Sequence, residues 1–186
     1  MRKFDRNQIK EDLREIMTKD TVFVCVGTNK IVFDLFGPLC GDHLKRKNIP
    51  YFGDCEYNVN ALTMEDRLKE IYDKNKLENK NIIAIDAAIT DDDEKVNKVL
   101  VNKERGIYPG AGVGKNFPMI GAKAIMMFTL NKTDLKYTME MYRTKSLNEG
   151  KAYDRADLGR IKRYATDLVN IIEEVYNEVC NVEITI

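Results

Sequence analysis

Apolar residues recur at helical spacing near the start of the chain. Ile9, Leu13 and Ile16 lie three or four positions apart, which predicts an amphipathic helix over residues 5–18. An Asp–x–x–Gln motif that begins at Asp5 supplies a candidate N-terminal cap. The pattern therefore indicates a helix in front of the first strand.

Two short segments are apolar almost without interruption, which is typical of strands buried on both faces of a parallel sheet. They are TVFVCVG at residues 21–27 and NIIAIDAAI at residues 81–89. Weaker strand patterns lie near residues 50–57, 96–101 and 122–130.

Helical patterns separate these strands. After a predicted loop over residues 28–37, the segment GPLCGDHLKRK predicts a helix that starts near Pro38, because proline is tolerated in a first helical turn. Thr63 and Asp66 form a candidate cap for the next helix. Alternating helices and strands are typical of a largely parallel sheet with helices on both faces. We therefore predict a three-layer α/β/α fold.

The C-terminal part of the chain changes to a helical pattern. Residues 131–180 are predicted to be helical, with a break at residues 148–150 and a long amphipathic helix that starts at Asp154. Its apolar face carries Leu158, Ile161, Leu168, Ile171, Ile172, Val175 and Val179. This face either packs on its own sheet or is partly buried in a homodimer. No linker divides residues 1–186, so we predict a single domain.

Composition narrows the class of protein. The 186 residues are 44% hydrophobic and 32% charged, as in an ordinary soluble globular domain. Thirty basic and thirty acidic residues cancel, which argues against broad binding to nucleic acid or an anionic membrane. The N-terminal segment has no apolar core, and no apolar run approaches the roughly twenty residues of a membrane helix. We therefore expect a cytoplasmic protein without nucleic-acid or membrane partners.

The cysteines, the single histidine and the acidic run do not indicate a metal site or a nucleophilic catalytic site. The four cysteines are Cys25, Cys40, Cys55 and Cys180. They lack zinc-finger or redox-motif spacing and are interpreted as reduced thiols, mostly in the core. His43 lies in a basic helix and is interpreted as a surface residue, so no Ser-His-Asp or Cys-His system is predicted. The acidic run at residues 91–94 lacks the spacing of a calcium loop and is interpreted as a solvated turn.

The segment YPGAGVGKNFPMIG at residues 108–121 is rich in glycine. Pro109 stands where a phosphate loop needs its first glycine, and Asn116 follows the lysine in place of Ser or Thr. Pro118 disfavours the helix that such a loop would open. A nucleotide or sugar-phosphate enzyme is therefore a weak alternative. Two interpretations remain, a tight surface turn or a backbone that approaches a substrate.

Two aspartates follow predicted strands at the edge where open parallel sheets bind ligands. Asp34 lies in the loop after the first strand, and Asp86 ends the apolar run NIIAID. Each alone could be a turn or capping residue. If they converge, the two carboxylates share one proton, so that one activates water while the other donates. We place the glycine-rich segment at the same edge, where Lys115 is either an oxyanion stabiliser or a surface residue.

Three segments together resemble a known family. VCVGTNKIVFDLFGPLCGDHL, IIAIDAAI and PGAGVGKNFPMIG, in this order over about residues 20–130, resemble the YyaC-type sporulation proteins of spore-forming Firmicutes. These proteins are similar to the germination protease of spores and, more distantly, to hydrogenase maturation endopeptidases. The resemblance implies a three-layer α/β/α fold, a peptidase-like site and a location in the cytoplasm of the spore or forespore. It does not extend to the helical region 131–180.

The resemblance also implies roles for individual residues. In the germination protease two aspartates carry catalysis without metal, and by motif they correspond to Asp34 and Asp86. The implied substrate-binding residues are Gly27, Thr28, Asn29, Gly110, Gly112, Gly114 and Lys115. The implied function is hydrolysis of a peptide bond in a protein substrate. The alternative is a non-catalytic sporulation factor that binds peptide or protein at the same surface.

Two features depart from the family pattern. The first loop reads Gly-Thr-Asn and continues with Ile31, Val32 and Phe33, where the family usually has Gly-Thr-Asp and small polar residues. The metal-binding relatives use a glutamate in the first loop and a later histidine, whereas this chain has Asp34 and no histidine after His43. We therefore predict neither a metal nor a cofactor.

Overall fold

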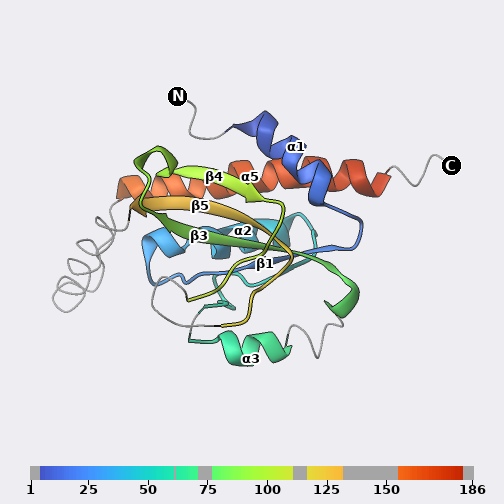
Figure 1. Cartoon of the computed structure of the whole chain (residues 1–186), viewed down its shortest axis with the longest axis horizontal. Coiled ribbons are helices and arrows are strands. Elements are labelled where there is room, and N and C mark those ends of the chain that lie inside the picture. The colour runs from blue at the N-terminus through green and yellow to red at the C-terminus, as the bar shows by residue number, and fades with distance from the viewer. Residues whose placement is uncertain (1–4, 61, 71–76, 111–116, 132–154, 182–186) are drawn as a thin grey trace.

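The computed structural model describes residues 5–60, 62–70, 77–110, 117–131 and 155–181. They contain a five-stranded sheet with the strand order β2-β1-β3-β5-β4 (Figure 1). The strands are β1 (Thr21–Cys25), β2 (Tyr51–Phe52), β3 (Asn81–Thr90), β4 (Lys98–Asn102) and β5 (Lys123–Asn131). β4 runs antiparallel to β5 and the other pairings are parallel, which confirms the predicted largely parallel sheet.

The sheet is built around β3. It pairs with β1 from Asn81 to Ile85 and with β5 from Ile83 to Thr90. Because β1 ends at Cys25, the second half of β3 pairs with no strand except β5 among the described residues. The two long apolar runs of the sequence thus form the adjacent central strands, as their composition predicts.

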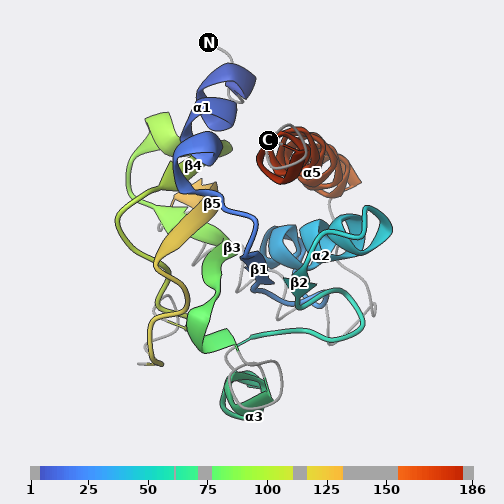
Figure 2. The ribbon, with the colours of Figure 1, turned by 90° about the vertical axis from the view of Figure 1, so that its right-hand side faces the viewer.

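Three helices cover one face of the sheet, and a short helix lies on the other (Figure 2). The helices are α1 (Arg6–Ile16), α2 (Phe36–Arg46), α3 (Met64–Lys69) and α5 (Arg155–Asn181), and the short 3-10 turns are η1 (Val32–Asp34), η3 (Leu77–Asn79) and η4 (Asp93–Lys95). The long helix predicted from Asp154 is α5, whereas the predicted helical segment before it falls in residues 132–154, outside the described residues. None of the described helices is long and apolar enough to cross a membrane.

The larger hydrophobic cluster lies between the sheet and the helices α1, α2 and α5. Leu13 of α1, Phe36 of α2 and Ile83 of β3 are fully buried in it. Leu168 and Ile172 of α5 are buried in the same cluster, and each such side chain contributes about 1.5–3 kcal/mol on burial. The apolar face of α5 is thus packed within its own chain. A homodimer remains a prediction, but the apolar face of α5 does not support it.

A second, smaller cluster fills the opposite face of the sheet. Val24 and Ala84 of the central strands meet Met64 of α3 there. Ile107 and Ile120, from the connection between β4 and β5, complete this cluster. Because α3 is short, connecting segments cover much of this face. The predicted α/β class is confirmed, with one of the outer layers thin.

The two predicted helix caps have different outcomes. The Gln8 N–H donates to Oδ1 of Asp5 over 3.1 Å, which confirms Asp5 as the cap of α1. Thr63 precedes α3, but its side chain makes no capping bond. Its hydroxyl instead donates to the Asn58 carbonyl at 2.9 Å. The predicted Thr63 cap is wrong because the preceding turn uses this hydroxyl.

The loop predicted over residues 28–37 is shorter than expected. η1 forms within it, and α2 begins at Phe36, two residues before Pro38. Pro38 lies in the first turn of α2, as predicted, where its missing N–H costs no helical hydrogen bond. The earlier start of α2 leaves one residue between Asp34 and the helix.

The connection between β4 and β5, which carries the glycine-rich segment, leaves the sheet at the edge opposite to the one predicted for this segment. β4 is antiparallel to β5, and Asn102 at the end of β4 pairs with Ala124 near the start of β5. The connection therefore leaves and re-enters the sheet at the amino edge of the parallel strands. Ile107 and Ile120 pair across this connection and form its stem, while residues 111–116 lie outside the described residues. The apolar pattern of β4 carried no information on its direction.

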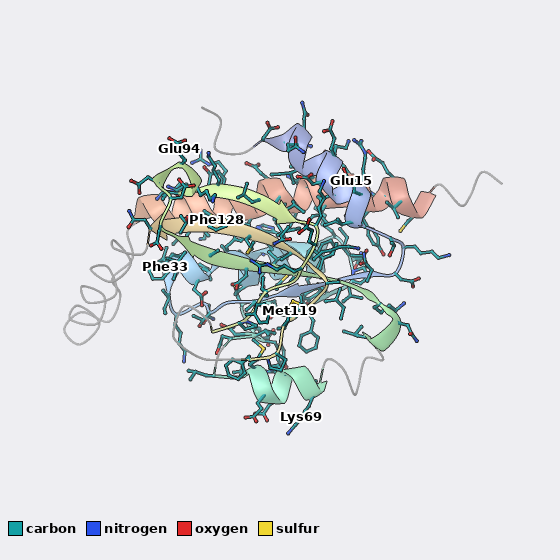
Figure 3. The ribbon with its side chains drawn as sticks, viewed as in Figure 1. Glu15, Phe33, Lys69, Glu94, Met119 and Phe128 are labelled. Atoms are coloured by element: carbon teal, nitrogen blue, oxygen red, sulfur yellow. The ribbon has the colours of Figure 1, made fainter. Side chains whose placement is uncertain are left out.

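Charged side chains such as those of Glu15, Lys69 and Glu94 lie at the periphery of the ribbon (Figure 3). Lys103 pairs with Asp12 at 3.1 Å and with Glu15 at 2.8 Å, which links the end of β4 to α1. The Glu94 N–H donates to Oδ1 of Asp92 at 3.0 Å in an exposed turn. The acidic run is thus a solvated turn, as predicted.

The histidine and two of the four cysteines contribute to the packing of the fold. His43 is half-buried, and its Nε2 lies 3.2 Å from Oγ1 of Thr166, so it connects α2 to α5 and is not a free surface residue. All four cysteines are free thiols, and Cys25 and Cys40 are fully buried. The prediction of reduced thiols in the core therefore holds for two of the four.

Candidate functional site

The candidate site lies where β1 ends. The chain turns at Gly27, whose φ of 138° lies in the region that favours glycine. A Cβ on Gly27 would lie 2.1 Å from the carbonyl oxygen of Asp34. The Thr28 N–H donates to the same oxygen at 3.1 Å. The loop therefore folds back on itself and brings Asp34 beside the end of β1.

The start of α2 holds this loop against the sheet. A Cβ on Gly37 would lie 2.0 Å from the Val26 carbonyl oxygen and 2.9 Å from that of Ile85. Any larger residue at this position would push α2 away from the ends of both strands. Ile85 directly precedes Asp86, and η1 contacts β3. The close approach of α2 thus brings the segment that carries Asp34 towards Asp86.

The negative charge of Asp34 acts on the carboxyl of Asp86. Burial raises the pKa of Asp34 to about 7, and a hydrogen bond from the Thr28 backbone lowers it only in part. Burial also raises the pKa of Asp86 well above its usual range, and the negative charge of Asp34 raises it further. Both side chains retain some exposure to solvent. The charge of Asp34 thus reaches Asp86, as convergence requires, whereas a proton shared by the two carboxylates remains a prediction.

Few donors compensate the charge of this pair. The Ala87 N–H donates to Oδ1 of Asp86 at 2.8 Å. Among the described residues, no lysine or arginine forms an ion pair with either carboxylate. The described residues also contain no cluster of three or more His, Cys, Asp or Glu side chains that could hold a metal ion. The arrangement is suited to accepting and donating a proton near neutral pH.

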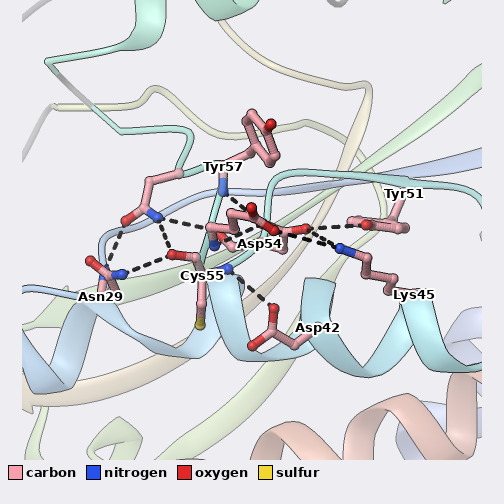
Figure 4. A network of polar contacts seen from close by, with 9 residues as sticks. Asn29, Asp42, Lys45, Tyr51, Asp54, Cys55 and Tyr57 are labelled. Carbon is pink, nitrogen blue, oxygen red and sulfur yellow. Dashed lines mark hydrogen bonds and ion pairs between the residues drawn. The ribbon is translucent and has the colours of Figure 1, made fainter.

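The Gly-Thr-Asn loop is tied to the turn that follows β2. The Asn29 N–H donates to Oδ1 of Asn58 at 2.9 Å. The Asn29 side-chain amide donates to the Cys55 carbonyl at 2.8 Å (Figure 4). Asn29 therefore holds the loop in place. Substrate contact by Gly27, Thr28 and Asn29 remains a prediction.

Asp54 was not predicted from the sequence, although only 3% of its surface is exposed. Its Oδ1 accepts hydrogen bonds from the N–H groups of Glu56 at 2.9 Å and Tyr57 at 2.7 Å. Its Oδ2 accepts from the Tyr51 hydroxyl at 3.1 Å and lies 3.6 Å from Nζ of Lys45. We name the nine residues of Figure 4 the Asp54 network: Asn29, Asp42, Lys45, Tyr51, Asp54, Cys55, Glu56, Tyr57 and Asn58.

These partners decide the charge of Asp54. Burial alone would raise its pKa, but the Tyr57 and Glu56 N–H groups, the Tyr51 hydroxyl and Lys45 outweigh burial and lower the pKa. An aspartate whose side chain accepts from the N–H groups two and three residues later is typical of an Asx turn. The Gly-Asp pair after a short strand was the sequence signal that could have identified it.

Of the predicted residues in the glycine-rich segment, the structure describes Gly110. Its φ of 77° is the left-handed conformation expected of glycine in a tight turn. Gly112, Gly114 and Lys115 lie outside the described residues. Their contact with substrate remains a prediction.

These features define an α/β protein with two interacting carboxylates near the carboxyl edge of a largely parallel sheet. Residues 2–149 match the family described as "Protein of unknown function (DUF1256)", and the chain belongs to this family. The chain is similar to "Uncharacterized protein YyaC" of Bacillus subtilis (strain 168), with 32% identity over 118 residues. This match covers 61% of the chain and 55% of that protein, so the chain spans about half the length of the relative. The resemblance to YyaC-type proteins is therefore confirmed.

Proposed function

We propose that this protein is a peptidase that hydrolyses a peptide bond in a protein substrate through Asp34 and Asp86. The observation that carries the proposal is the effect of Asp34 on Asp86, because burial raises both pKa values and the charge of Asp34 raises that of Asp86 further. The resemblance to the germination protease assigns catalysis to the same two residues. It also supports a role in sporulation, in the cytoplasm of a spore or forespore.

The proposed reaction uses one water molecule and no metal. The ionised member of the pair accepts a proton from water, and the water oxygen bonds to the carbonyl carbon of the peptide. The protonated member gives its proton to the leaving nitrogen as the C–N bond breaks. The products are a carboxyl and an amino group, and the pair again holds one proton. Backbone N–H groups of residues 110–115 are proposed to stabilise the oxyanion or to hold the substrate.

Hydrolysis of a library of random-sequence decapeptides, followed by mass spectrometry, tests this function without knowledge of the substrate. Asp34→Asn and Asp86→Asn are each expected to lower the cleavage rate by about two orders of magnitude or more. Asp20→Asn is the matched control, because Asp20 is exposed, pairs with Lys80 at 2.7 Å and precedes β1, at the opposite end of this strand from the candidate site. Its cleavage rate should stay within a few fold of wild type, and EDTA should leave cleavage unchanged. Equal rates in wild type and both pair variants would overturn the proposal.

The physiological substrate requires a second experiment. Asp86→Asn keeps the shape of the side chain and removes the proposed base, so it should retain bound substrate. We expect one or more proteins from sporulating cells to accumulate on Asp86→Asn relative to wild type. The same proteins should be shortened in cells that contain the wild-type chain.

The alternative function is non-catalytic binding of peptide or protein at the same surface. The apolar first loop favours it, because Ile31 and Phe33 are partly exposed where the family usually has small polar residues. A binding protein would retain the decapeptides without cleaving them at any pH at which it is folded. That result would replace the peptidase with the binding function.

A further inference from the structure

The second half of β3 has an unpaired edge that begins at the candidate site. β1 pairs with β3 as far as Cys25 and Ile85, whereas β5 follows β3 to Thr90. The Val26 N–H donates to the Ile85 carbonyl at 2.7 Å, and the chain of β1 then turns away at Gly27. Among the described residues, no strand borders β3 on this side beyond Ile85.

The direction of the backbone N–H and C=O groups at this edge follows from the regular alternation of residues along a strand. Peptide groups of alternate residues point to the same side. The pairing with β5 shifts in register between Ala88 and Ile89, where β5 has one extra residue between Phe128 and Leu130 and β3 has none. Since Ile85 faces β1 and β3 keeps its own alternation, we infer that Ala87 and Ile89 direct their N–H and C=O groups towards the open edge. The Asp86 carboxylate accepts the Ala87 N–H at 2.8 Å. The Ala87 carbonyl and both backbone groups of Ile89 have no partner on this side among the described residues.

This edge is open to solvent in part. Residues 82–85 are buried, whereas residues 86–89 are all half-buried. The Ala87 and Ala88 side chains are small, so they leave room for the side chains of a neighbouring strand. η1, which carries Phe33, contacts β3 and lies near this edge.

We propose that the substrate binds as an added strand along residues 86–90 of β3, so that its scissile bond lies beside Asp86. This inference rests on the proposed peptidase function. Unpaired N–H and C=O groups in a row recognise an extended backbone of almost any sequence, as in other cases of strand addition. A helical segment cannot bind in this way, because its own turns use its backbone groups. The substrate class is therefore an extended, unfolded segment of a protein.

A proline substitution tests the edge without disturbing the rest of the sheet. Ile89→Pro removes the N–H at the open edge and leaves the pairing with β5, since proline is tolerated at strand edges. Ile89→Val is the matched control, because it keeps the N–H at a similar side-chain size. Relative to Ile89→Val, we expect Ile89→Pro to cleave the decapeptide library about fivefold to tenfold more slowly, through a higher KM with kcat retained. Equal cleavage by two folded variants would overturn strand addition.

Amide exchange keeps the inference testable if Ile89→Pro does not fold. The variant Asp34→Asn is used because it is expected to bind peptides without cleaving them. The hydrogen-exchange rate of its Ile89 amide is measured by NMR in the absence and in the presence of the decapeptide library. A matched library with alternate peptide nitrogens methylated is the control. We expect the unmodified library to slow exchange at Ile89 by about tenfold or more and the methylated library to slow it far less.

The outcomes separate this inference from the peptidase function. Protection of Ile89 together with cleavage by wild type supports both. Protection without cleavage supports strand addition and overturns the peptidase function. Cleavage without protection overturns strand addition and leaves the peptidase function standing, whereas absence of both overturns both.

Discussion

Asp54 is buried and Asp86 is half-buried, but their carboxylates behave in opposite ways. Asp54 accepts three hydrogen bonds and has a lysine nearby, and its pKa is lowered. Asp86 accepts one hydrogen bond from Ala87 and faces the charge of Asp34, and its pKa is raised. Burial opposes the charged form in both cases, so the partners of each carboxylate decide its protonation.

The two environments also differ in their effect on the fold. The charge of Asp54 holds the turn after β2, and through Asn58 this turn holds the loop that carries Asn29. The charge of the Asp34–Asp86 pair has few donors, so ionisation of both members opposes folding. A satisfied carboxylate therefore has a structural role, and an unsatisfied pair is the candidate for proton transfer.

The largest expected difference in stability is between Asp54→Ala and Asp86→Asn. Asp54→Ala leaves the Tyr51 hydroxyl and two backbone N–H groups without their acceptor, so we expect a loss of about 3 kcal/mol in the free energy of unfolding. Asp86→Asn removes repulsion with Asp34, so its melting temperature should equal or exceed that of wild type. Urea unfolding of both variants measures this difference. A clearly lower stability of Asp86→Asn with full activity would make Asp86 the structural residue.

pH should act on the two environments in opposite directions. The pKa of Asp34 is raised to about 7, so its contribution to stability is complete below about pH 4 and is lost as the pH rises through about 7. The pKa of Asp54 is lowered, so the contribution of Asp54 to stability is present above about pH 4. This contribution is lost as the pH falls through the pKa that Asp54 has in the folded protein. Melting temperatures between about pH 3 and pH 9 should therefore fall less with rising pH in Asp34→Asn. In Asp54→Asn, the melting temperature should fall less with falling pH than in wild type. Melting temperatures that depend on pH identically in wild type and both variants would contradict the opposite pKa shifts of Asp34 and Asp54.

A smaller effect is expected from Asn58, which connects the Asp54 network to the first loop. Asn58→Ala removes the acceptor of the Asn29 N–H and the donor to the carbonyls of Asp54 and Cys55. We expect a loss of about 1–2 kcal/mol in unfolding free energy and a lower cleavage rate. Asn58→Asp keeps the acceptor for Asn29 and should recover part of the activity. If the stability falls but the cleavage rate of Asn58→Ala is unchanged, the network does not position the candidate site.

Exposed ion pairs between α1 and α5 should contribute least. Nε of Arg14 lies 2.8 Å from Oε2 of Glu178, and Nζ of Lys10 lies 3.0 Å from Oε1 of the same residue. Solvent and salt screen such pairs, so Glu178→Gln should lower the melting temperature by no more than about 2 °C. The difference should vanish at about 1 M salt. A larger, salt-independent loss would show that these charges stabilise the fold more than the carboxylates inside it.

The fold could be predicted from the sequence where burial dictates the residue type. The continuous apolar runs of β1 and β3 identified the central strands, and helical spacing identified α1 and α5. The direction of β4 could not be predicted, because the same apolar pattern fits both directions of pairing. The edge at which the connection between β4 and β5 leaves the sheet was therefore not predicted, and residues 111–116 of this connection lie outside the described residues.

The candidate site could be predicted in part for a similar reason. Asp34 and Asp86 follow strands that apolar composition identifies, and parallel strands bring such residues to one edge. Asp54 follows a strand of two residues and owes its burial to hydrogen bonds with its own turn and with Lys45. Thr63 failed as a cap because the same turn uses its hydroxyl. Side-chain bonds within irregular segments depend on tertiary structure that a linear pattern does not contain.

Carbon-13 NMR titration of the side-chain carboxyls of Asp34, Asp54 and Asp86 tests the central claim most directly. We expect Asp54 to titrate below its ordinary value of about 3.9, while the pair titrates in two steps with one at about 7 or above. Asp34→Asn should lower the pKa of Asp86, because it removes the neighbouring charge. If both members of the pair instead titrate near 4 and Asp86 is unchanged in Asp34→Asn, the two carboxylates do not share a proton and the proposed site is wrong.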